Sequence, residues 1–378
     1  MIESAGAQEY WIARPAWAAS ATRPKRKETP MNIVIWGTGP KALEFAGLCD
    51  PAKVSVLAFV DEDPARQGTT FLDREVLAPG VLSRLSFDAL FLSTRDWQAD
   101  KERIAREFGV PAEKIRAYYQ NRFALLREIG REGLIPANLT DEDVARLDSI
   151  PWYHAVEVFP GVFTPGWAEL QTFLIDQLAP EQVAGKKVLD IGAWTGPYTF
   201  EMERRGALVT PYDIQDPQTS GFDLLKSMRG SKAEYIRDSV YNLPQHFDKT
   251  FDVIMFFGVY YHLFNPMLAF TNIHQSLKDD GIMLFEGAVL EYAYEMDPDW
   301  ASRKDRMGPY LEVPLAYFTR GDCYGHWSNW YVPNVLCLRE WIMAAGFEIL
   351  EMYLVRGGSR AFGMARKSTP QVPAEHSR

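Results

Sequence analysis

The chain has 378 residues, of which 47% are hydrophobic and 24% are charged, and its formal net charge is −10. This composition is typical of a globular protein, and the length is sufficient for two domains. The acidic balance disfavours broad electrostatic binding to nucleic acid or to anionic lipid. The longest uncharged apolar run, residues 253–261, has about half the length of a membrane span, so we expect no membrane insertion. Three widely spaced cysteines fit a protein of the reducing cytoplasm.

Both ends of the chain are expected to be disordered. Residues 1–30 form an extension with a basic cluster at 23–27, and Met31, which opens an apolar run, is the more natural start. A signal peptide does not fit, because the basic cluster comes late and no apolar core follows it. Residues 367–378 form a polar tail that contains prolines.

Residues 31–119 are predicted to form a small Rossmann-like domain. Short apolar runs alternate here with a glycine-containing turn and with amphipathic stretches. This alternation is typical of an α/β fold and favours a parallel sheet. The elements that we expect are strands at 32–36, 54–60 and 87–93 and a helix at 101–108.

A nucleotide site, for NAD or another nucleotide, is one interpretation of this domain. Gly37, Gly39 and Ala42 fit the G-x-G-x-x-G/A spacing, and Asp61 follows about twenty residues later, where a ribose-binding acid would lie. The domain is short, however, and Pro40 removes an N–H that could face a phosphate. The stretch FVDEDPARQG resembles small nucleotide-binding-like domains attached to polysaccharide and nucleotide-sugar enzymes. That resemblance implies a nucleotide or nucleotide-sugar ligand, or a docking role compatible with a homodimer; a retained fold without a ligand is the alternative.

Residues 120–164 are predicted to connect two domains. Helices are expected at 121–130 and 140–147, and the second begins with Thr140 as N-cap and Asp143 in the third position, an approximate capping box.

The segment that follows, IPWYHAVEVFPGVFTPGW, crowds aromatic residues, prolines and glycines around His154. We expect no regular element in it, and its aromatic rings require a covering partner. It is either a wall of an active site or a packed linker between domains.

A second α/β domain is predicted for residues 165–366. In VLDIGAWTGPYTFEMERRGA, an apolar strand ends in Asp190, a turn contains Gly192 and Gly196, and a helix follows at 198–205. Glycines let the backbone approach a ligand, and the first turn of the helix presents free N–H groups. A strand–helix turn without a ligand is the alternative.

Four later strands are expected to end beside this turn. They are predicted at 207–212, at 234–236, from residue 251 onward and at 281–285. They lead to Asp213, to Asp238, Ser239 and Val240, to an aromatic loop with His262, and to Glu286. Ligands of open α/β sheets bind outside the carboxyl ends of the strands, so these ends should form one crevice. Asp213 is suited to ribose hydroxyls and the segment 238–240 to an adenine. Residues 347–355 and 360–365 are predicted to form a β-hairpin that closes the sheet.

This order of motifs resembles the class I S-adenosylmethionine-dependent methyltransferases. The motifs that carry the resemblance are VLDIGAWTG, YDIQD, RDSVYNLP, FDVIMFFGVYYHL, GIMLFEG and the terminal hairpin. Within that class the chain resembles the family related to tRNA uridine-34 carboxymethyltransferase, through WYH, PGVFTPG, GVYYH, WYVPN and AGF between residues 151 and 366. The fold implied is α/β with two domains, a small Rossmann-like parallel sheet followed by a methyltransferase sheet with a C-terminal antiparallel hairpin.

The resemblance implies S-adenosyl-L-methionine as cofactor and assigns a part of it to each motif. The methionine part would lie near Asp190, Gly192 and Gly196, the ribose at Asp213, the adenine near Asp238, Ser239 and Val240, and the sulfonium near Phe257 and Tyr261. Trp194 stands where the family has its middle glycine, so a large ring would narrow the pocket.

The catalytic candidates are His154, His262, Glu286 and Tyr261. Imidazole titrates near neutral pH, which suits a base that removes a proton from the acceptor. His262 could equally anchor its loop, and Glu286 could bind substrate or assist deprotonation. Arg360 would hold an anionic group or be a solvated charge.

The segment 317–330 is expected to cover the substrate. Cys323 and His326 within it lack partners for a metal site, so no metal is expected.

Methyl transfer to oxygen or nitrogen of a small molecule, such as a sugar, nucleotide sugar or secondary metabolite, is the leading functional hypothesis. The alternative is a tRNA wobble-uridine (carboxy)methyltransferase, for which nucleic acid would be a partner; the N-terminal module offers no basic face for it beyond the first thirty residues. A non-catalytic cofactor-binding protein and a dehydrogenase based on the first domain are the remaining interpretations.

Overall fold

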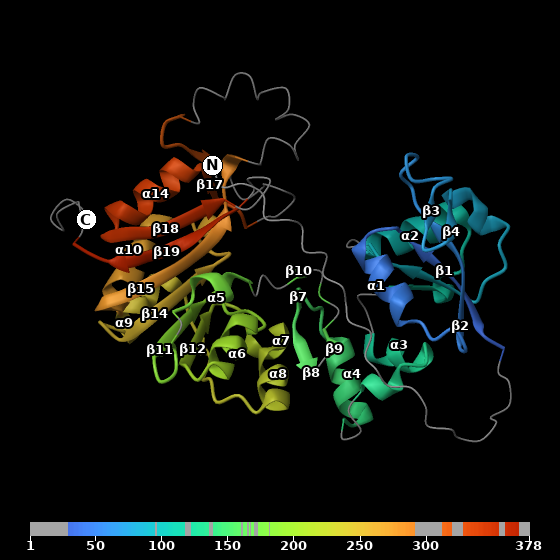
Figure 1. Ribbon diagram of the computed structural model, residues 1–378, viewed down its shortest axis with the longest axis horizontal. Coiled ribbons are helices and arrows are strands. Elements are labelled where there is room, and N and C mark those ends of the chain that lie inside the picture. Colours follow the sequence, from blue (N-terminus) through green and yellow to red (C-terminus); the bar gives the residue numbers. More distant parts are fainter. Residues whose placement is uncertain are drawn as a thin grey trace.

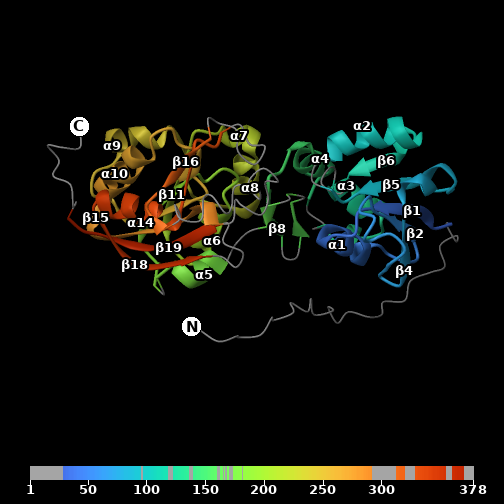
Figure 2. The same ribbon diagram turned by 90° about the horizontal axis from the view of Figure 1, so that it is seen from above.

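The computed structural model describes residues 29–94, 97–117, 122–135, 139–159, 162–164, 166, 168–169, 173–180, 182–291, 312–319, 328–354 and 360–369. Two α/β lobes lie on either side of a smaller connecting region, and the two views agree on this arrangement (Figures 1 and 2). The expectations for residues 1–28, for the tail from 370, for Cys323 and His326, and for the turn 356–359 lie outside the described residues. Within those ranges, no helix is long and apolar enough to cross a membrane.

The N-terminal lobe is a six-stranded sheet in the order β3-β4-β2-β1-β5-β6, parallel except for the β3–β4 pair. Its elements are β1 (Met31–Trp36), α1 (Pro40–Leu48), β2 (Val54–Val60), β3 (Thr70–Phe71), β4 (Arg74–Leu77), η1 (Pro79–Ser83), β5 (Ala89–Leu92), α2 (Trp97–Phe108), η2 (Ala112–Lys114) and β6 (Ile115–Ala117).

Consecutive residues of β1 face opposite sides of this sheet. Ile33 packs in the same apolar cluster as Phe45 of α1. The next residue, Val34, packs in the cluster that contains Ile104 of α2. A strand buried on both faces reads as a nearly continuous apolar run, which is why β2 has the predicted bounds and β1 begins only one residue earlier than predicted. Helix α2 begins four residues before the predicted start.

The connector contains α3 (Arg122–Glu128), η3 (Glu132–Leu134) and α4 (Asp141–Ser149). The predicted capping box of α4 is confirmed: the Thr140 side chain accepts from the Asp143 N–H at 3.1 Å, and the Asp143 carboxylate accepts from the Thr140 N–H at 3.1 Å.

The expectation that the aromatic segment contains no regular element is wrong. It forms the short strands β7 (His154–Ala155), β8 (Glu157–Phe159) and β9 (Val162–Phe163). Strand β8 pairs with β9, and β7 pairs with β10 (Ala168–Glu169), which directly follows the segment. A chain that runs through a packed region must pair its backbone groups. The Thr164 hydroxyl adds to this pairing, because it accepts from the Val156 N–H at 2.8 Å.

One apolar cluster continues from the N-terminal lobe through the connector into the second lobe. It contains Phe45 of α1, Leu126 of α3 and Leu147 of α4. It also contains Trp152 and Phe222, and Phe222 belongs to the second lobe. The connector is therefore packed on both sides.

The second lobe is a seven-stranded sheet in the order β13-β12-β11-β14-β15-β19-β18. Only β19 and β18 are antiparallel to their neighbours, which confirms the predicted closing hairpin. The elements are α5 (Phe173–Leu178), β11 (Lys187–Ile191), α6 (Pro197–Arg204), β12 (Leu208–Asp213), α7 (Pro217–Ser220), α8 (Phe222–Arg229), β13 (Ile236–Arg237), η4 (Val240–Asn242), α9 (Leu243–His246), β14 (Phe251–Phe257), η5 (Tyr260–His262), α10 (Pro266–Ser276), β15 (Leu277–Ala288), β16 (Ala316–Phe318), β17 (Tyr331–Pro333), α14 (Val335–Ala344), β18 (Phe347–Leu354) and β19 (Arg360–Lys367).

Two elements are longer than the sequence indicates. Strand β15 starts at Leu277 because that residue pairs with Phe251 of β14. Lys367, placed by the prediction in the disordered tail, is the last residue of β19, and its ammonium donates to the Leu277 carbonyl at 2.7 Å.

Gly287, in β15, is expected to tolerate no side chain. A Cβ at Gly287 would lie 2.4 Å from the buried ring of Tyr260, whose hydroxyl donates to the Ala288 carbonyl at 2.8 Å. Gly287→Ala should therefore lower the free energy of unfolding by about 1–3 kcal/mol, measured by urea denaturation. Gly80→Ala, where a Cβ meets nothing within 4 Å, is the control and should have little effect. Equal effects of the two substitutions would contradict this packing.

Candidate active site

The turn between β11 and α6 has three residues in left-handed backbone conformation. Their φ angles are +81° at Gly192, +43° at Trp194 and +85° at Gly196. A Cβ at Gly192 would lie 2.4 Å from the Val259 side chain, and one at Gly196 would lie 2.6 Å from the Phe222 ring. Both glycines are therefore required by backbone conformation and by packing.

Trp194 is a bulky residue in a conformation that such residues rarely adopt. Its ring stacks on Tyr153 of the connector, with 4.6 Å between centroids and 14° between planes. Its N–H donates to the Asp213 carboxylate at 3.0 Å, and its carbonyl accepts from the Ser220 hydroxyl at 3.1 Å. Contacts from three segments thus hold this turn in place.

Asp190, at the carboxyl end of β11, is a buried carboxylate that accepts from the Thr199 hydroxyl at 2.6 Å. Burial, together with the charge of the neighbouring Asp213, raises the pKa of Asp190 to about 7 against the opposing Thr199 hydrogen bond. The arrival of a cation would favour its charged form.

Asp213 ends β12 one strand away. Its oxygens accept from the N–H of Gln215 at 2.9 Å and from that of Trp194 at 3.0 Å. Burial raises the pKa of this carboxyl as well. Each oxygen keeps a lone pair, so the carboxylate can accept further hydrogen bonds from a ligand.

The loop after β13 is held by its own hydrogen bonds. Asp238 accepts at 2.7 Å from the Ser239 N–H, from the Asn242 amide and from the His246 ring, and the His246 bond contributes most to a pKa of about 2. The Asp238 N–H donates to the Asp213 carbonyl at 3.0 Å, which brings this loop beside the predicted ribose-binding residue. Val240 is buried.

Glu286, at the end of β15, forms a bidentate ion pair with Arg360 of β19. The second of its two hydrogen bonds, from Arg360 Nη2, is 2.8 Å long. The same Nη2 donates to the Tyr261 hydroxyl at 3.3 Å, and the guanidinium lies 5.4 Å from the centre of the Tyr261 ring. Arg360 is therefore not a solvated charge, and the Glu286 carboxylate is engaged in an ion pair.

The two histidines contact different parts of the site. His154 lies beside the first turn, where its Nδ1 is 2.8 Å from the Thr195 hydroxyl, and burial lowers its pKa to about 4. His262 lies in η5 with its Nδ1 2.9 Å from the Ser328 hydroxyl, and the Trp330 N–H donates to the Tyr261 carbonyl at 2.8 Å. These contacts agree with a role of His262 in anchoring its loop.

The predicted nucleotide site of the N-terminal lobe is occupied by polar contacts of the chain itself. Asp61 accepts from the Thr38 hydroxyl at 2.6 Å and from Arg66 at 3.3 Å. A Cβ at Gly37 would lie 2.6 Å from the Ser93 hydroxyl. A ribose at Asp61 would have to share or replace these donors.

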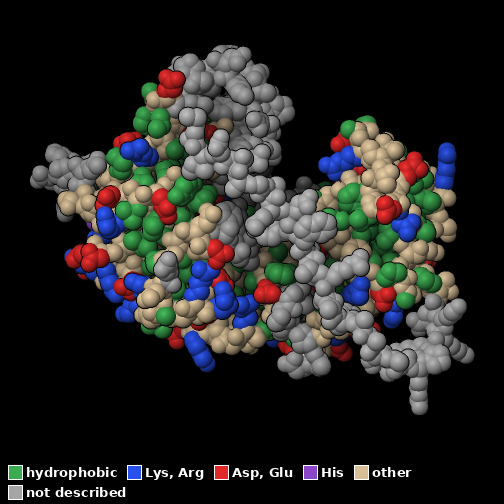
Figure 3. All heavy atoms as spheres, in the orientation of Figure 1, with side chains coloured by type: hydrophobic (Ala, Val, Ile, Leu, Met, Phe, Trp, Pro, Cys, Tyr) green, Lys and Arg blue, Asp and Glu red, His purple; other side chains and the backbone are tan. Residues whose placement is uncertain are grey.

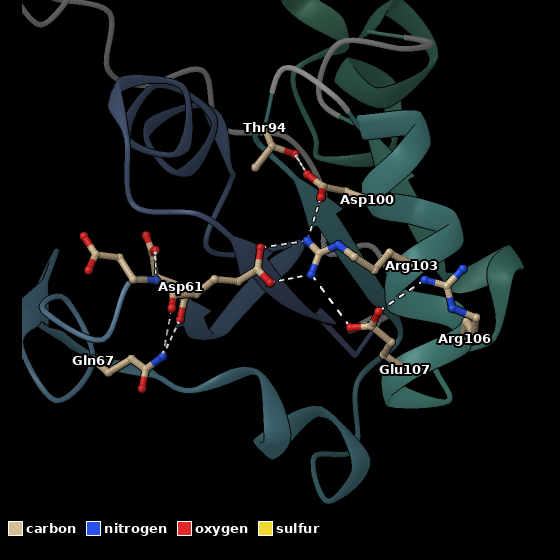
Figure 4. Close-up of polar contacts among 9 residues, drawn as sticks. Asp61, Gln67, Thr94, Asp100, Arg103, Arg106 and Glu107 are labelled. Carbon is tan, nitrogen blue, oxygen red and sulfur yellow. Dashed lines mark hydrogen bonds and ion pairs between the residues drawn. The ribbon is translucent and has the colours of Figure 1, made fainter. Parts of the chain in front are cut away.

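Arg103 of α2 extends this network across the strand ends (Figure 4). Its Nη2 donates to the Glu62 carboxylate and to the Asp100 carboxylate, both at 2.7 Å. The Thr94 hydroxyl also donates to Asp100. In the described part of the chain, no group of three or more potential metal ligands occurs.

Several residues that lie in the site were not predicted from the sequence. Tyr153 stacks on the first turn, Thr195 and Thr199 bond to predicted site residues, and the Tyr198 ring packs against Phe257 with 5.0 Å between centroids. The polar residues of WYH and TGPYT, grouped around the turn, were the available signal.

Asp190→Asn should change stability in a pH-dependent way. The unfolded Asp190 carboxyl ionises near pH 3.8 and the folded one near pH 7, so its contribution to stability falls as the pH rises between these values. Relative to wild type, the variant should gain stability over this range, with a limiting slope of about 1.4 kcal/mol per pH unit. Urea denaturation at pH 5 and pH 8 measures this, with the exposed Asp223→Asn as control. If the unfolding free energies of the variant and the wild type differ by the same amount at pH 5 and at pH 8, that result contradicts the burial argument.

Comparison with known proteins identifies the families that the two lobes match. A methyltransferase domain model matches residues 168–351, and a model described as C2185-like, N-terminal, matches residues 29–116. The tRNA U34 carboxymethyltransferases of Campylobacter lari and Desulfotalea psychrophila are 27% and 28% identical to the chain over 191 residues, which is 50% of this chain and 59% and 51% of theirs. The chain thus spans only part of the length of these relatives.

A crystal structure of Burkholderia thailandensis 1,6-didemethyltoxoflavin-N1-methyltransferase with bound S-adenosylhomocysteine is 19% identical, covers 52% of this chain and 76% of that chain, and has a TM-score of 0.39. A likeness this low carries no functional argument. The family match and the strand order of the second sheet agree: residues 168–351 belong to the class I S-adenosylmethionine-dependent methyltransferases, and a C2185-like domain precedes them.

Proposed function

We propose that the chain transfers the methyl group of S-adenosylmethionine to an oxygen or nitrogen of a small molecule, such as a sugar, nucleotide sugar or secondary metabolite. The observation that carries this proposal is the convergence of strand ends in the second sheet. Asp213 and Phe257 end β12 and β14, and Asp190 and Glu286 lie within two residues of the ends of β11 and β15; these four strands are adjacent in the order β12-β11-β14-β15. Such an edge is where α/β sheets bind their ligands.

The residues at this edge fit the cofactor chemically. Asp213 keeps lone pairs for the hydroxyls of a ribose. Asp190 is buried and, among the described residues, pairs with no cation, so a positively charged ligand would stabilise its charged form. Gly192 and Gly196 allow the tight turn, and Trp194 with Tyr153 would border the cofactor on the connector side.

Bound S-adenosylmethionine supplies an electrophilic methyl group, and the chain orients the acceptor, excludes water and accepts its proton. His262 is the stronger base candidate, because burial holds the pKa of His154 at about 4 and Arg360 holds Glu286 as an ion pair. Tyr261, whose hydroxyl oxygen accepts from Arg360, can donate its own proton to an acceptor oxygen.

A tRNA wobble-uridine enzyme is the second candidate, and two observations favour it. The relatives named above are tRNA U34 carboxymethyltransferases, which runs against the expectation that nucleic acid is an unlikely partner. Arg360 and Tyr261 also provide donors that suit the carboxylate of a carboxymethyl group. Charge gives this candidate no further support on the face shown in Figure 3, where acidic and basic side chains are interspersed over the second lobe.

Asp213→Ala should weaken S-adenosylmethionine binding at least about tenfold, because a bidentate acceptor for the ribose is lost. Isothermal titration calorimetry measures the dissociation constant. Asp223→Ala, an exposed carboxylate on α8 of the same lobe, is the control and should bind as wild type does. Unchanged affinity of Asp213→Ala would remove the site assignment.

Tritiated methyl transfer separates the two acceptor classes. The protein is incubated with S-adenosyl-[methyl-³H]methionine and either a small-molecule cell extract or bulk tRNA. We expect counts in the small-molecule fraction. Counts in tRNA that fall steeply with salt would instead establish the second candidate, since phosphate contacts depend on ionic strength. Asp213→Ala, as a control, should lose the counts in both.

A further inference from the structure

Four aromatic residues next to η5 form a group that the roles assigned above do not involve. Phe264 follows η5 by two residues, and Phe318 is the last residue of β16. Trp330 directly precedes β17, and Tyr331 is the first residue of that strand. Three segments that are distant in the sequence thus meet here. We call these four residues the aromatic patch.

The rings of the aromatic patch contact one another, and two of them are open to solvent. The Phe264 ring meets the Trp330 ring edge to face, with 5.1 Å between centroids and 89° between planes. The Phe318 ring lies 6.1 Å from the Trp330 ring and 5.1 Å from the Tyr331 ring. Phe264 is 62% exposed and Phe318 is 44% exposed. Exposed apolar side chains that adjoin one another, unlike those scattered singly, mark binding surfaces.

Backbone hydrogen bonds fix the position of the aromatic patch. The Trp330 N–H donates to the Tyr261 carbonyl at 2.8 Å, and the Trp330 carbonyl accepts from the Thr319 N–H at 2.9 Å. Phe318 pairs with Tyr331 in the antiparallel ladder of β16 and β17. Because the backbone that carries the rings is already ordered, a ligand that binds them loses less free energy to ordering.

The aromatic patch adjoins the stronger base candidate. His262 lies two residues before Phe264, and its Nδ1 is 2.9 Å from the hydroxyl of Ser328, two residues before Trp330. The Tyr261 ring, which belongs to the candidate active site, lies 4.2 Å from the imidazole of His262. A molecule seated on the patch would therefore lie next to the group that can accept its proton.

The charge of these segments narrows the class of ligand. Residues 260–268, 316–319 and 328–333 contain no Asp, Glu, Lys or Arg. Phosphate groups, as in a nucleotide sugar, are held mainly by Arg and Lys. Surfaces that stack the bases of single-stranded nucleic acid likewise combine aromatic rings with a basic groove. An uncharged aromatic ring, in contrast, gains burial and edge-to-face or offset contacts from exposed rings alone.

We propose that the aromatic patch binds the methyl acceptor, and that this acceptor is a small, uncharged molecule with an aromatic ring. The inference rests on the proposed function and deepens it, because it names the chemical class of the acceptor and the residues that select it. The ring stacks on Phe264, Phe318 and Trp330. A lone pair of the acceptor oxygen or nitrogen forms the new bond to the methyl carbon, the carbon–sulfur bond breaks with its electron pair left on sulfur, and the acceptor proton passes to His262.

The test incubates the protein with S-adenosyl-[methyl-³H]methionine, bulk tRNA and a small-molecule extract of the organism that makes it. The mixture is then partitioned between ethyl acetate and water, and tRNA is recovered from the water by acid precipitation. An uncharged aromatic product enters the organic phase, whereas a nucleotide sugar and unreacted S-adenosylmethionine stay in water. We expect counts in the organic phase, in a product with the ultraviolet absorption of an aromatic ring.

Phe264→Ser and Phe318→Ser each remove one exposed ring. With dilute extract, each should lower the rate of transfer to the organic-phase product at least about tenfold, because stacking and apolar burial are lost. With concentrated extract the rate should approach that of wild type, since KM rises and kcat does not. Phe264→Tyr keeps the ring and should keep the rate. Tyr353→Ser, at an exposed aromatic position on β18, is the control.

Binding of S-adenosylmethionine, measured by isothermal titration calorimetry, should be the same in these variants as in wild type, which shows that they are folded. Counts in a water-soluble small molecule, an organic-phase product without aromatic absorption, or a rate that both serine variants leave unchanged overturns the inference alone. Counts in tRNA alone, or in no fraction, overturn the proposed function as well, so the two failures can be told apart.

Discussion

The stacking of Tyr153 on Trp194 is the contact on which the candidate site depends. A bulky residue in left-handed conformation costs on the order of 1–2 kcal/mol, and a stacked aromatic pair offsets about 0.5–1.5 kcal/mol of it. The backbone hydrogen bonds of Trp194 to Asp213 and Ser220 contribute the rest. Because the connector supplies Tyr153, the shape of the first turn is set by residues outside the sheet that carries it.

The charged side chains at the strand ends are paired differently in the two sheets. In the N-terminal lobe Asp61 is paired with Arg66, and Arg103 is paired with Glu62 and Asp100, so each of these carboxylates has a cationic partner. In the second lobe Glu286 is compensated by Arg360, whereas Asp190 is buried without a cation among the described residues. An uncompensated carboxylate is where a positively charged ligand gains most.

Elements determined by local sequence could be predicted, and those determined by distant contacts could not. The runs 31–36 and 54–60 are apolar except for one polar residue each and are followed by turn residues, and the capping box at Thr140 spans four residues. Strands β7 to β10 depend on partners that no local pattern marks. The same holds for the ion pair of Glu286 and Arg360, which are 74 residues apart. Because the sequence does not reveal this pair, Glu286 was a candidate to bind substrate or to assist deprotonation. The roles given to the cofactor-binding residues stay predictions.

The apolar cluster that runs from α1 through α3 and α4 to Phe222 has a mechanical consequence. Trp152 belongs to this cluster, and Tyr153, the next residue, stacks on the turn at Trp194. A partner of the N-terminal lobe that altered this packing would therefore also alter the support of the turn, and thermodynamic linkage would make such an effect reciprocal.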